Sequence, residues 1–327
     1  MKGERVLVTG AGGFIGSHLV EALVAKGAQV RALLHYGSEG GLGNARFIPE
    51  RAAAAAEWVH GDLTDSEFVA TIVADRSIVF HLGALIAIPY SYKAPRSFVD
   101  VNVSGTLNIL EAVRHAGAKL VQTSTSEVYG SALYVPMDEK HPLRAQSPYA
   151  ATKIAADKLA ESYHAAFGVD VVTVRPFNTY GPRQSARAVI PTVIGQALGG
   201  ANKIMLGATE PVRDMTFVTD TAAGMIAAAE TPDIAGGVYN LGTGAGESIG
   251  SIARKILDLI NIDAEIVIDP TRLRPAGSEV DRLISDNSAF RHRTGWAPKY
   301  DLVDGLAETI AFFRAHPGLL PTQGYVL

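Results

Sequence analysis

Hydrophobic and polar residues recur with two periods, that of strands and that of helices, along the first half of the chain. A β-branched run over 5–9 has the pattern of a buried strand, and apolar residues then recur at helical spacing from Phe14 to Lys26, before Gly27. The same patterns predict strands over 28–34, 58–62, 77–84, 119–126 and 170–178, and helices over 51–57, after a capping box at 64–67, near 96–116 and over 148–167. Repeated strand–helix–strand units with right-handed crossovers indicate an α/β fold with a doubly wound parallel sheet.

The regular alternation of predicted strands and helices ends after residue 178. Turn-forming residues become frequent, and the stretches 213–220 and 236–244 have the pattern of strands isolated among loops. Regular elements then return as a helix over 248–261, a strand over 264–268 and a terminal helix over 302–314. We expect one domain over 1–178, to which 214–245 returns, and a smaller mixed α/β lobe over 179–213 and 246–327.

Composition narrows the classes of function. Of 327 residues, 47% are hydrophobic and 19% are charged, which is typical of a globular chain that buries a large core. A net charge of −4 without a Lys/Arg cluster argues against a nucleic-acid partner. The sequence has no cysteine, no signal-peptide pattern and no apolar run of the ~20 residues that a bilayer requires. We expect a soluble, cytoplasmic protein with no membrane partner and no metal.

The stretch TGAGGFIG, residues 9–16, lies between the first strand and the first helix, where a dinucleotide fingerprint belongs. Gly10 permits the tight turn, Gly13 lets a pyrophosphate approach the backbone, and Gly16 lets the helix pack on the strand. The older Gly-x-Gly-x-x-Gly spacing needs a glycine where this chain has Ile15. Because the helix N-terminus offers unpaired N–H groups to phosphates, we predict a site for NAD or NADP.

The end of the second strand leaves the choice between these two cofactors open. NAD sites usually have Asp or Glu there to bind the ribose 2′-hydroxyl, whereas this chain has Leu34 and no acid nearby. A 2′-phosphate could bind instead, with His35, Tyr36, Ser38 or Arg46 as its partner. No arginine follows the strand directly, so NADP is not established either.

Tyr149 and Lys153 are four residues apart on the helix over 148–167, so their side chains share one face. The pair follows the fifth strand of the predicted sheet, which favours a catalytic role over a solvated helix face. Tyrosine is a poor base at its reference pKa of ~10, but a neighbouring ammonium favours the phenolate. We expect Lys153 to supply that charge and to bind the nicotinamide ribose.

Six motifs in order resemble those of the extended short-chain dehydrogenases/reductases: TGAGGFIG, HLGA, STSEVYG, YAATK, RPFNTYGPR and RDMTFVTD. The resemblance covers almost the whole chain and points to the nucleotide-sugar epimerase/dehydratase group. It implies a Rossmann domain, a substrate-binding smaller lobe, and a catalytic set of Thr125, Tyr149 and Lys153. It also implies substrate contacts at Asn178, Arg213 and Arg274. The expected cofactor contacts are Gly10, Gly13, Phe14, Ile15, Gly16, Asp62, Leu63, Leu82, Gly83, Ala84, Thr123, Tyr149, Lys153 and Pro176.

The stretch TSTSEVYG, residues 123–130, separates the reactions of this group. By resemblance, epimerases have small or apolar residues at the position of Glu127, whereas 4,6-dehydratases have an Asp-Glu pair. In that pair Glu removes the C5 proton and Asp helps water to leave from C6. This chain keeps Glu127 but has Ser126 at the Asp position, and a hydroxyl is a far weaker acid. The same string also resembles UDP-glucuronate decarboxylases.

Other stretches, such as ALIAIPYSYKAP and RLRPAGSEVDRL, are most similar to dehydratases of amino-sugar pathways, for example the one leading to legionaminic acid. We expect a 4,6-dehydratase of UDP- or GDP-N-acetylglucosamine with a tightly bound, recycled NAD or NADP. The alternatives are a UDP-glucuronate decarboxylase, a nucleotide-sugar 4-epimerase and, in a different class, a non-catalytic cofactor-sensing protein.

Two predicted helices carry apolar residues on more than one face, so one face can cover the sheet while another binds a partner. These residues are Leu107, Leu110 and Val113 in the first helix, and Ile154, Leu159 and Tyr163 in the second. Together with the resemblance, this pattern predicts a homodimer formed through a four-helix bundle.

Overall fold

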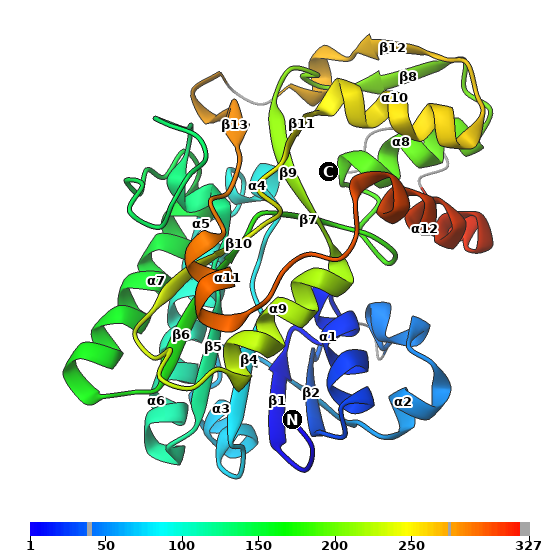
Figure 1. Ribbon diagram of the computed structural model, residues 1–327. Coiled ribbons are helices and arrows are strands. Elements are labelled where there is room, and N and C mark those ends of the chain that lie inside the picture. The colour runs from blue at the N-terminus through cyan, green and yellow to red at the C-terminus, as the bar shows by residue number, and fades with distance from the viewer. Residues whose placement is uncertain (38–40, 274–275, 321–327) are drawn as a thin grey trace.

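A seven-stranded parallel sheet lies at the centre of the computed structural model, which describes residues 1–37, 41–273 and 276–320 (Figure 1). Across the sheet the strands are β10 (Val238–Leu241), β6 (Val171–Pro176), β5 (Lys119–Thr123), β4 (Ile78–His81), β1 (Arg5–Thr9), β2 (Gln29–His35) and β3 (Glu57–Gly61). All neighbours pair in parallel. The strand order reverses between β1 and β4, which is where doubly wound sheets bind ligands. The predicted fold class is confirmed.

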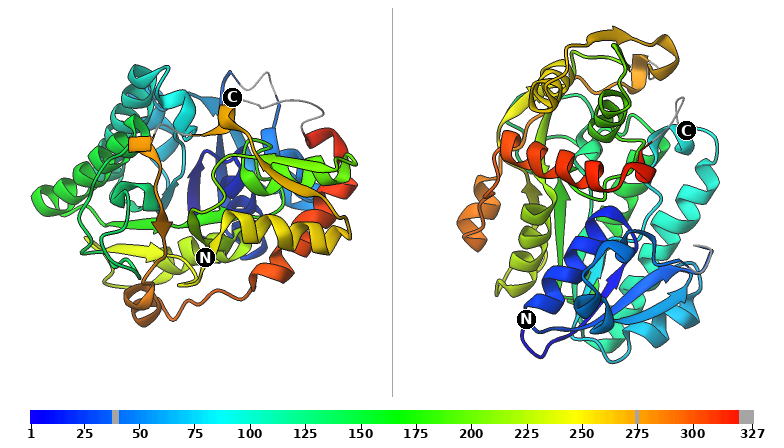
Figure 2. Two further views of the ribbon diagram at one scale, coloured as in Figure 1. Left: turned by 90° about the horizontal axis from the view of Figure 1, so that it is seen from above. Right: turned by 90° about the vertical axis from the view of Figure 1, so that its right-hand side faces the viewer.

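Helices cover both faces of this sheet because buried strand residues alternate between the faces (Figures 1 and 2). Val6 and Val8 of β1 join one buried cluster, and Leu7 joins the other. The first cluster includes residues of α1 (Phe14–Ala25) and α9 (Val218–Glu230). The second includes residues of α3 (Ser66–Val73), α6 (Gly105–Ala116) and α7 (Pro148–Phe167).

The segments beyond β6 build a second group of elements, which lies above the sheet in Figure 1. A smaller sheet contains β7 (Asn178–Tyr180), β9 (Val212–Phe217), β11 (Gly246–Ser248) and β13 (Arg282–Leu283), and β8 (Lys203–Leu206) pairs with β12 (Glu265–Ile268). A separate apolar core joins them to α8 (Val189–Leu198), α10 (Ile249–Ile260) and α12 (Leu302–Ala315). The remaining α-helices are short: α2 (Glu50–Ala54), α4 (Ile88–Ser91), α5 (Pro95–Phe98) and α11 (Ser288–Thr294).

Several elements differ from those expected. The strand predicted over 119–126 ends at Thr123, because a 3₁₀ helix, η3 (Ser126–Tyr129), follows it. The capping box at 64–67 is wrong: Asp65 caps α3, and its Oδ1 accepts a hydrogen bond from the Phe68 N–H at 3.0 Å. The stretch 213–220 is no isolated strand either, since it passes from β9 directly into α9.

The stretch 236–244 likewise does not stand alone, because it contains β10, which pairs with β6 at the edge of the main sheet. Helices α8, α9 and α11 were not expected, because small residues and turn formers obscure their helical periodicity. The division of the chain into two domains stays a prediction. Within the described residues, no helix is both long and apolar enough to cross a membrane.

A π-helix, η2 (Val99–Ser104), connects α5 to α6 within the helix expected near 96–116. It places the buried Asn102 against the loop that follows β4. The Leu85 N–H donates to Asn102 Oδ1 at 2.8 Å, and Asn102 Nδ2 donates to the Leu85 carbonyl at 2.9 Å and to Thr152 Oγ1 at 3.1 Å. Irregular helical turns of this kind often occur at functional sites. Here the turn ties the β4 loop to α7, which carries the predicted catalytic pair.

We predict that Asn102→Ala lowers the free energy of unfolding by about 1–3 kcal/mol, because it leaves buried polar groups of the β4 loop without partners. Urea denaturation followed by circular dichroism measures this change. Asn108→Ala, on α6, is the matched control: Asn108 is only partly buried and donates to the Leu63 carbonyl, so its loss should be smaller. Equal losses in the two variants would contradict the role given to Asn102.

Candidate active site

The residues predicted to do the chemistry meet between β5, η3 and α7. Thr125 is the N-cap of η3, and its Oγ1 accepts a hydrogen bond from the Glu127 N–H at 3.2 Å. Tyr149, in the first turn of α7, is buried and hydrogen-bonded to Thr125. Burial raises the pKa of the Tyr149 phenol, the Thr125 hydrogen bond opposes that rise, and the Glu127 carboxylate adds to it. A hydroxyl, a phenol and a carboxylate are therefore grouped at one point.

Lys153 lies one turn after Tyr149 and is also buried. Its Nζ donates a hydrogen bond to the Thr123 carbonyl at 2.6 Å. Burial lowers the pKa of Lys153 to about 8, although the nearby Asp157 carboxylate raises it. Burial raises the pKa of the Tyr149 phenol in this structure, and the Glu127 and Asp157 carboxylates add to the rise. That Lys153 favours the phenolate stays a prediction.

The predicted cofactor residues line the carboxyl ends of the strands. Leu82, Gly83 and Ala84 follow β4, Asp62 and Leu63 follow β3, Thr123 ends β5 and Pro176 ends β6. Because parallel strands end at the same edge, these residues share one side of the sheet with the glycine loop.

The glycine loop packs too closely to admit side chains. A Cβ on Gly10 would lie 2.9 Å from the Gly83 nitrogen, and one on Gly16 would lie 2.2 Å from the Gly10 carbonyl oxygen. No side chain caps the start of α1, where Phe14 and Ile15 begin the helix. Open N–H groups at a helix start suit a pyrophosphate.

A second feature of the site also suits a dinucleotide. Thr123 Oγ1 is buried and, among the described residues, makes no hydrogen bond, although the Lys153 ammonium binds the carbonyl of the same residue. Buried polar atoms normally have partners, so an unpaired one indicates a group that binds there. The residues present fit a dinucleotide.

The sequence analysis missed a chain of hydrogen bonds that holds this edge together. Thr9 Oγ1 accepts from the Leu82 N–H at 3.1 Å and from the Gly83 N–H at 2.9 Å. Its own hydrogen is therefore directed to His81 Nδ1 at 2.8 Å, which leaves His81 Nε2 to donate to Thr106 Oγ1 at 3.2 Å. His81 lies in the motif HLGA and in the strand predicted over 77–84, but nothing near it in sequence indicated Thr9 and Thr106 as its partners.

The end of β2 remains compatible with either dinucleotide. Leu34 is buried and lies against the glycine loop, where a Cβ on Gly12 would come within 2.7 Å of it. His35 Nε2 lies 3.7 Å from Asp62 Oδ2, and the His35 ring stacks on the exposed Tyr36. Ser38 lies outside the described residues.

The predicted substrate residues Asn178 and Arg213 line one cavity of about 500 Å³. Its wall also contains Arg187 and Arg272, and a carboxylate, Glu279, whose Oε1 lies 3.3 Å from Arg213 Nη2. The third predicted contact, Arg274, lies outside the described residues. The cavity combines the positive charge and polar groups that a diphosphate requires.

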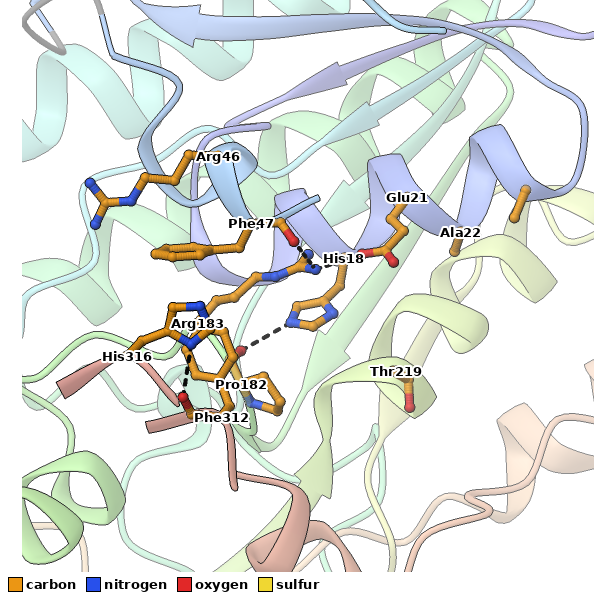
Figure 3. A pocket seen from close by; sticks show the side chains of 11 residues that line it. His18, Glu21, Ala22, Arg46, Phe47, Pro182, Arg183, Thr219, Phe312 and His316 are labelled. Atoms are coloured by element: carbon orange, nitrogen blue, oxygen red, sulfur yellow. Dashed lines mark hydrogen bonds and ion pairs between the residues drawn. The ribbon is translucent and has the colours of Figure 1, made fainter. Parts of the chain in front are cut away.

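A second cavity, of about 710 Å³, lies elsewhere, between α1, α12 and the loop after β7 (Figure 3). Arg183 crosses it, and its Nη2 donates to Glu21 at 2.7 Å and to the Phe47 carbonyl at 3.0 Å. Arg46 stacks on the Phe47 ring at 4.7 Å. The predicted catalytic and substrate residues do not line this cavity.

Comparisons with known proteins identify the family. The model of the family described as GDP-mannose 4,6 dehydratase matches residues 7–309. A dTDP-glucose 4,6-dehydratase of Actinoplanes is 34% identical over 324 residues, covering 95% of this chain and 98% of that protein. The chain therefore belongs to the nucleotide-sugar epimerase/dehydratase family of extended short-chain dehydrogenases/reductases.

Two solved structures show the same fold. A UDP-N-acetylglucosamine 4-epimerase of Methanobrevibacter ruminantium, in complex with UDP-N-acetylmuramic acid, is 30% identical with a TM-score of 0.87, covering 96% of this chain and 99% of that one. A dTDP-glucose 4,6-dehydratase of Streptomyces venezuelae with NAD and TYD bound is also 30% identical, with a TM-score of 0.86 and coverages of 97% and 98%. Relatives with this fold thus include both epimerases and dehydratases.

The buried imidazole of His81 should make the stability of the protein depend on pH. Burial, and to a smaller extent the charge of Lys153, lowers the pKa of His81 to about 3. Below the ordinary histidine pKa of ~6.5 the unfolded chain therefore binds a proton that the native protein does not, so stability is lost as the pH falls. Between pH 7.5 and 5.5 this loss should be about 1.4 kcal/mol.

Urea unfolding at both pH values tests this expectation. In His81→Gln, the loss of unfolding free energy between pH 7.5 and 5.5 should be smaller by about 1.4 kcal/mol than in the wild type, whatever the effect of the substitution on stability at pH 7.5. The same substitution at the exposed His292 on α11 is the matched control. Identical pH dependences in the wild type and in His81→Gln would contradict the assignment.

Proposed function

We propose that the protein is an NAD(P)-dependent nucleotide-sugar 4,6-dehydratase, with UDP- or GDP-N-acetylglucosamine as its substrate. The observation that carries the proposal is the position of Glu127, two residues after Thr125, where its carboxylate raises the pKa of Tyr149. Abstraction of the C5 proton requires a base, and a carboxylate can serve as that base. A simple 4-epimerisation requires no base at C5. The named dehydratase relatives support this choice.

The protein binds NAD or NADP, in line with relatives whose structures contain NAD. The residues that would hold the dinucleotide are those of the glycine loop, the β3 and β4 ends, Thr123 and Lys153. When bound, the nicotinamide would supply the hydride acceptor for oxidation at C4 and the hydride donor for reduction at C6. Since the hydride is returned, the cofactor is recycled and can stay tightly bound.

The protein's own residues move the protons. Tyr149 accepts the proton of the C4 hydroxyl, and the hydrogen bond from Thr125 favours the phenolate that this step requires. The ketone at C4 acidifies the C5 proton, and Glu127 removes it. Ser126 is buried at the position where dehydratases of the group have Asp, so water leaves from C6 with a weaker acid beside it.

The cavity around Asn178 and Arg213 would hold the nucleotide diphosphate of the substrate. The N-acetylhexosamine assignment rests on the resemblance of the sequence stretches 84–95 and 272–283 to amino-sugar dehydratases. The epimerase alternative is favoured by one observation, the close likeness in fold to a UDP-N-acetylglucosamine 4-epimerase. Glu127 weighs against it, since epimerases of the group have small or apolar residues there.

We also propose a homodimer formed through the exposed faces of the helices expected to form it. Leu110, Val113 and Tyr163 are buried in the protein's own core, so they cannot bind a partner. The exposed apolar side chains on these helices are Val99 and Leu107, on the η2–α6 helix, and Phe167, the last residue of α7. The part of the η2–α6 helix that carries Val99 and Leu107 forms an exposed face. This face would pair with its copy across a two-fold axis.

Glu127→Gln keeps size and hydrogen bonding but removes the base, so product formation should fall by roughly 10²–10⁴-fold. In D₂O the wild type should place deuterium at C5 of the product, whereas in the variant this exchange should fall by the same factor. Mass spectrometry of the sugar nucleotide measures both quantities.

Ser126→Ala is the matched control, because it alters the neighbouring side chain without removing the base. Its effect should be smaller, since a hydroxyl is a poor acid and a water can replace it. If Glu127→Gln dehydrated the sugar at the wild-type rate, this result would contradict the assignment of Glu127 as the base.

Light scattering at micromolar concentration should give the mass of a dimer, and Leu107→Glu should give that of a monomer, because a charge cannot be buried in an apolar interface. Leu133→Glu is the matched control: Leu133 is also exposed but lies in a loop away from these helices. A monomeric wild type would refute the dimer.

A further inference from the structure

A glutamine just before α7 is hydrogen-bonded to two other parts of the candidate active site. Gln146 precedes Ser147, the N-cap of α7, and lies three residues before Tyr149. Its side chain is partly buried, and both ends of its amide bind backbone groups. Nothing near it in sequence indicated these contacts, since one of its partners lies 131 residues away.

The acceptor end of this amide binds the segment that follows η3. Gln146 Oε1 accepts a hydrogen bond from the Ser131 N–H. Two residues before Gln146, the Arg144 N–H donates to the Val128 carbonyl at 2.8 Å. These two contacts hold the chain before α7 against the end of η3, the short helix that contains Glu127.

Gly130 allows this close approach. It lies at the end of η3, its φ is 65°, and its N–H donates to the Glu127 carbonyl at 3.3 Å. A Cβ at this position would lie 2.5 Å from the Arg144 carbonyl oxygen and 2.6 Å from Gln146 Oε1. Glycine adopts this backbone conformation readily and leaves room for the amide. The turn that ends η3 is thus built directly against Gln146.

The donor end of the amide binds a wall of the substrate cavity. Gln146 Nε2 donates to the Gly277 carbonyl at 3.1 Å and to the Glu279 carbonyl at 3.4 Å, in and just after the 3₁₀ helix η5 (Ala276–Ser278). Glu279 lines the cavity of about 500 Å³, where its Oε1 lies 3.3 Å from Arg213 Nη2. The main chain of Glu279 therefore binds Gln146, while its carboxylate binds the arginine proposed to hold the diphosphate.

A side-chain amide suits this set of contacts because it contains both an acceptor and donors. The Ser131 N–H needs an acceptor and the two carbonyls need donors, which fixes the orientation of the amide. A carboxylate has no hydrogen to donate at neutral pH, and an ammonium group cannot accept one. The residue type at 146 therefore fits a bridge between η3 and the cavity wall.

A nucleoside diphosphate in the cavity would compete with Glu279 for Arg213. Its negative charge attracts the guanidinium group and repels the carboxylate. A displacement at Glu279 reaches Gln146 through the carbonyl of the same residue, and it reaches η3 through Ser131. The contacts form a continuous path from the diphosphate wall to the candidate base.

We propose that Gln146 is a positioning residue that transmits occupancy of the substrate cavity to η3, and so holds Glu127 in its reactive position when the diphosphate is bound. Gln146 acts through Ser131 and Gly130 rather than by contact with the reacting atoms. The inference rests on the proposed function in taking Glu127 as the base and a nucleoside diphosphate as the ligand of the cavity.

Hydrogen–deuterium exchange of the purified dinucleotide-bearing protein tests this coupling without turnover. Mass spectrometry follows peptides that cover residues 127–131, with and without UDP, GDP or dTDP. In the wild type, bound nucleotide should slow exchange in these peptides by about 2–10-fold. Gln146→Met keeps the length of the side chain but lacks the amide. In this variant exchange should be faster without nucleotide, and the nucleotide should bind without slowing it.

Two further variants separate the bridge from general stability. Gln146→Glu keeps the acceptor but loses the donors, so exchange without nucleotide should stay closer to that of the wild type while the response to nucleotide is lost. Gln196→Met is the matched control, because Gln196 on α8 makes the same kinds of contact. Its Nε2 donates to the Thr192 and Met205 carbonyls at 3.3 and 3.2 Å, and its Oε1 accepts from the Met205 N–H at 2.7 Å. This control should keep the nucleotide response of the η3 peptides.

The deuterium that the product gains at C5 in D₂O is a second readout. Gln146→Met should lower this incorporation by roughly tenfold or more, because a displacement of about 1 Å in a reacting group can cost 10²-fold in rate. Gln196→Met should lower it less. Undiminished incorporation in Gln146→Met would overturn the proposal.

The exchange experiment also has outcomes that contradict the proposal. Equal slowing by nucleotide in the wild type and in Gln146→Met would overturn it, as would a nucleotide that binds the wild type without slowing exchange in η3. If none of the three nucleotides binds, the proposed substrate class fails and the coupling fails with it. If a nucleotide binds and slows exchange but no sugar loses water, the dehydratase assignment fails alone and the coupling through Gln146 stands.

Discussion

The ion pair between Asp157 and Arg175 joins the helix of the candidate catalytic residues to the central sheet. The side chains are 3% and 5% exposed, so both charges have left water. Such a pair persists only where further hydrogen bonds satisfy it, and Ser124 and Tyr129 provide them. Removing one partner of a buried pair typically destabilises a protein by about 3–5 kcal/mol. The geometry of the site and the integrity of the fold therefore depend on the same contacts.

This constraint accounts for the unusual content of residues 123–130, where hydroxyl groups crowd around one carboxylate. Ser124 binds Asp157, Thr125 binds Tyr149 and the backbone of Glu127, and Tyr129 binds Arg175. Ser124, Thr125 and Tyr129 each have a partner, whereas Thr123 Oγ1, at the end of the strand, is buried without one among the described residues. Glu127 is thereby held at the point where β5, η3 and α7 meet.

Local sequence patterns predicted the features that depend on residues close together in the chain. The glycine loop, the spacing of Tyr149 and Lys153, and the bounds of α7 all follow from residues that are close along the chain. Contacts between distant residues could not be predicted in this way. Arg175 was read as part of a strand, and nothing near it in sequence indicated Asp157 as its partner.

For a related reason, the sequence predicted two apolar faces on the helices of the expected dimer without indicating which residues would face a partner. Helical periodicity reveals that a helix has two apolar stripes but not which of them covers the sheet. The structure turns Leu110 and Val113 inward and leaves Leu107 outside. The stretch 214–245, expected to return to the first domain, contains β10, which pairs in parallel with β6; the local pattern did not indicate β6 as its neighbour, since the two strands are far apart in sequence.

The central claim is that the carboxylate at 127 makes this family member a dehydratase. The most direct measurement is the mass of the product formed from a panel of UDP-, GDP- and dTDP-linked sugars by the purified protein. The account predicts that a UDP- or GDP-linked N-acetylglucosamine loses one molecule of water. Loss of carbon dioxide from a uronate, or a product of unchanged mass with an inverted C4, would contradict it.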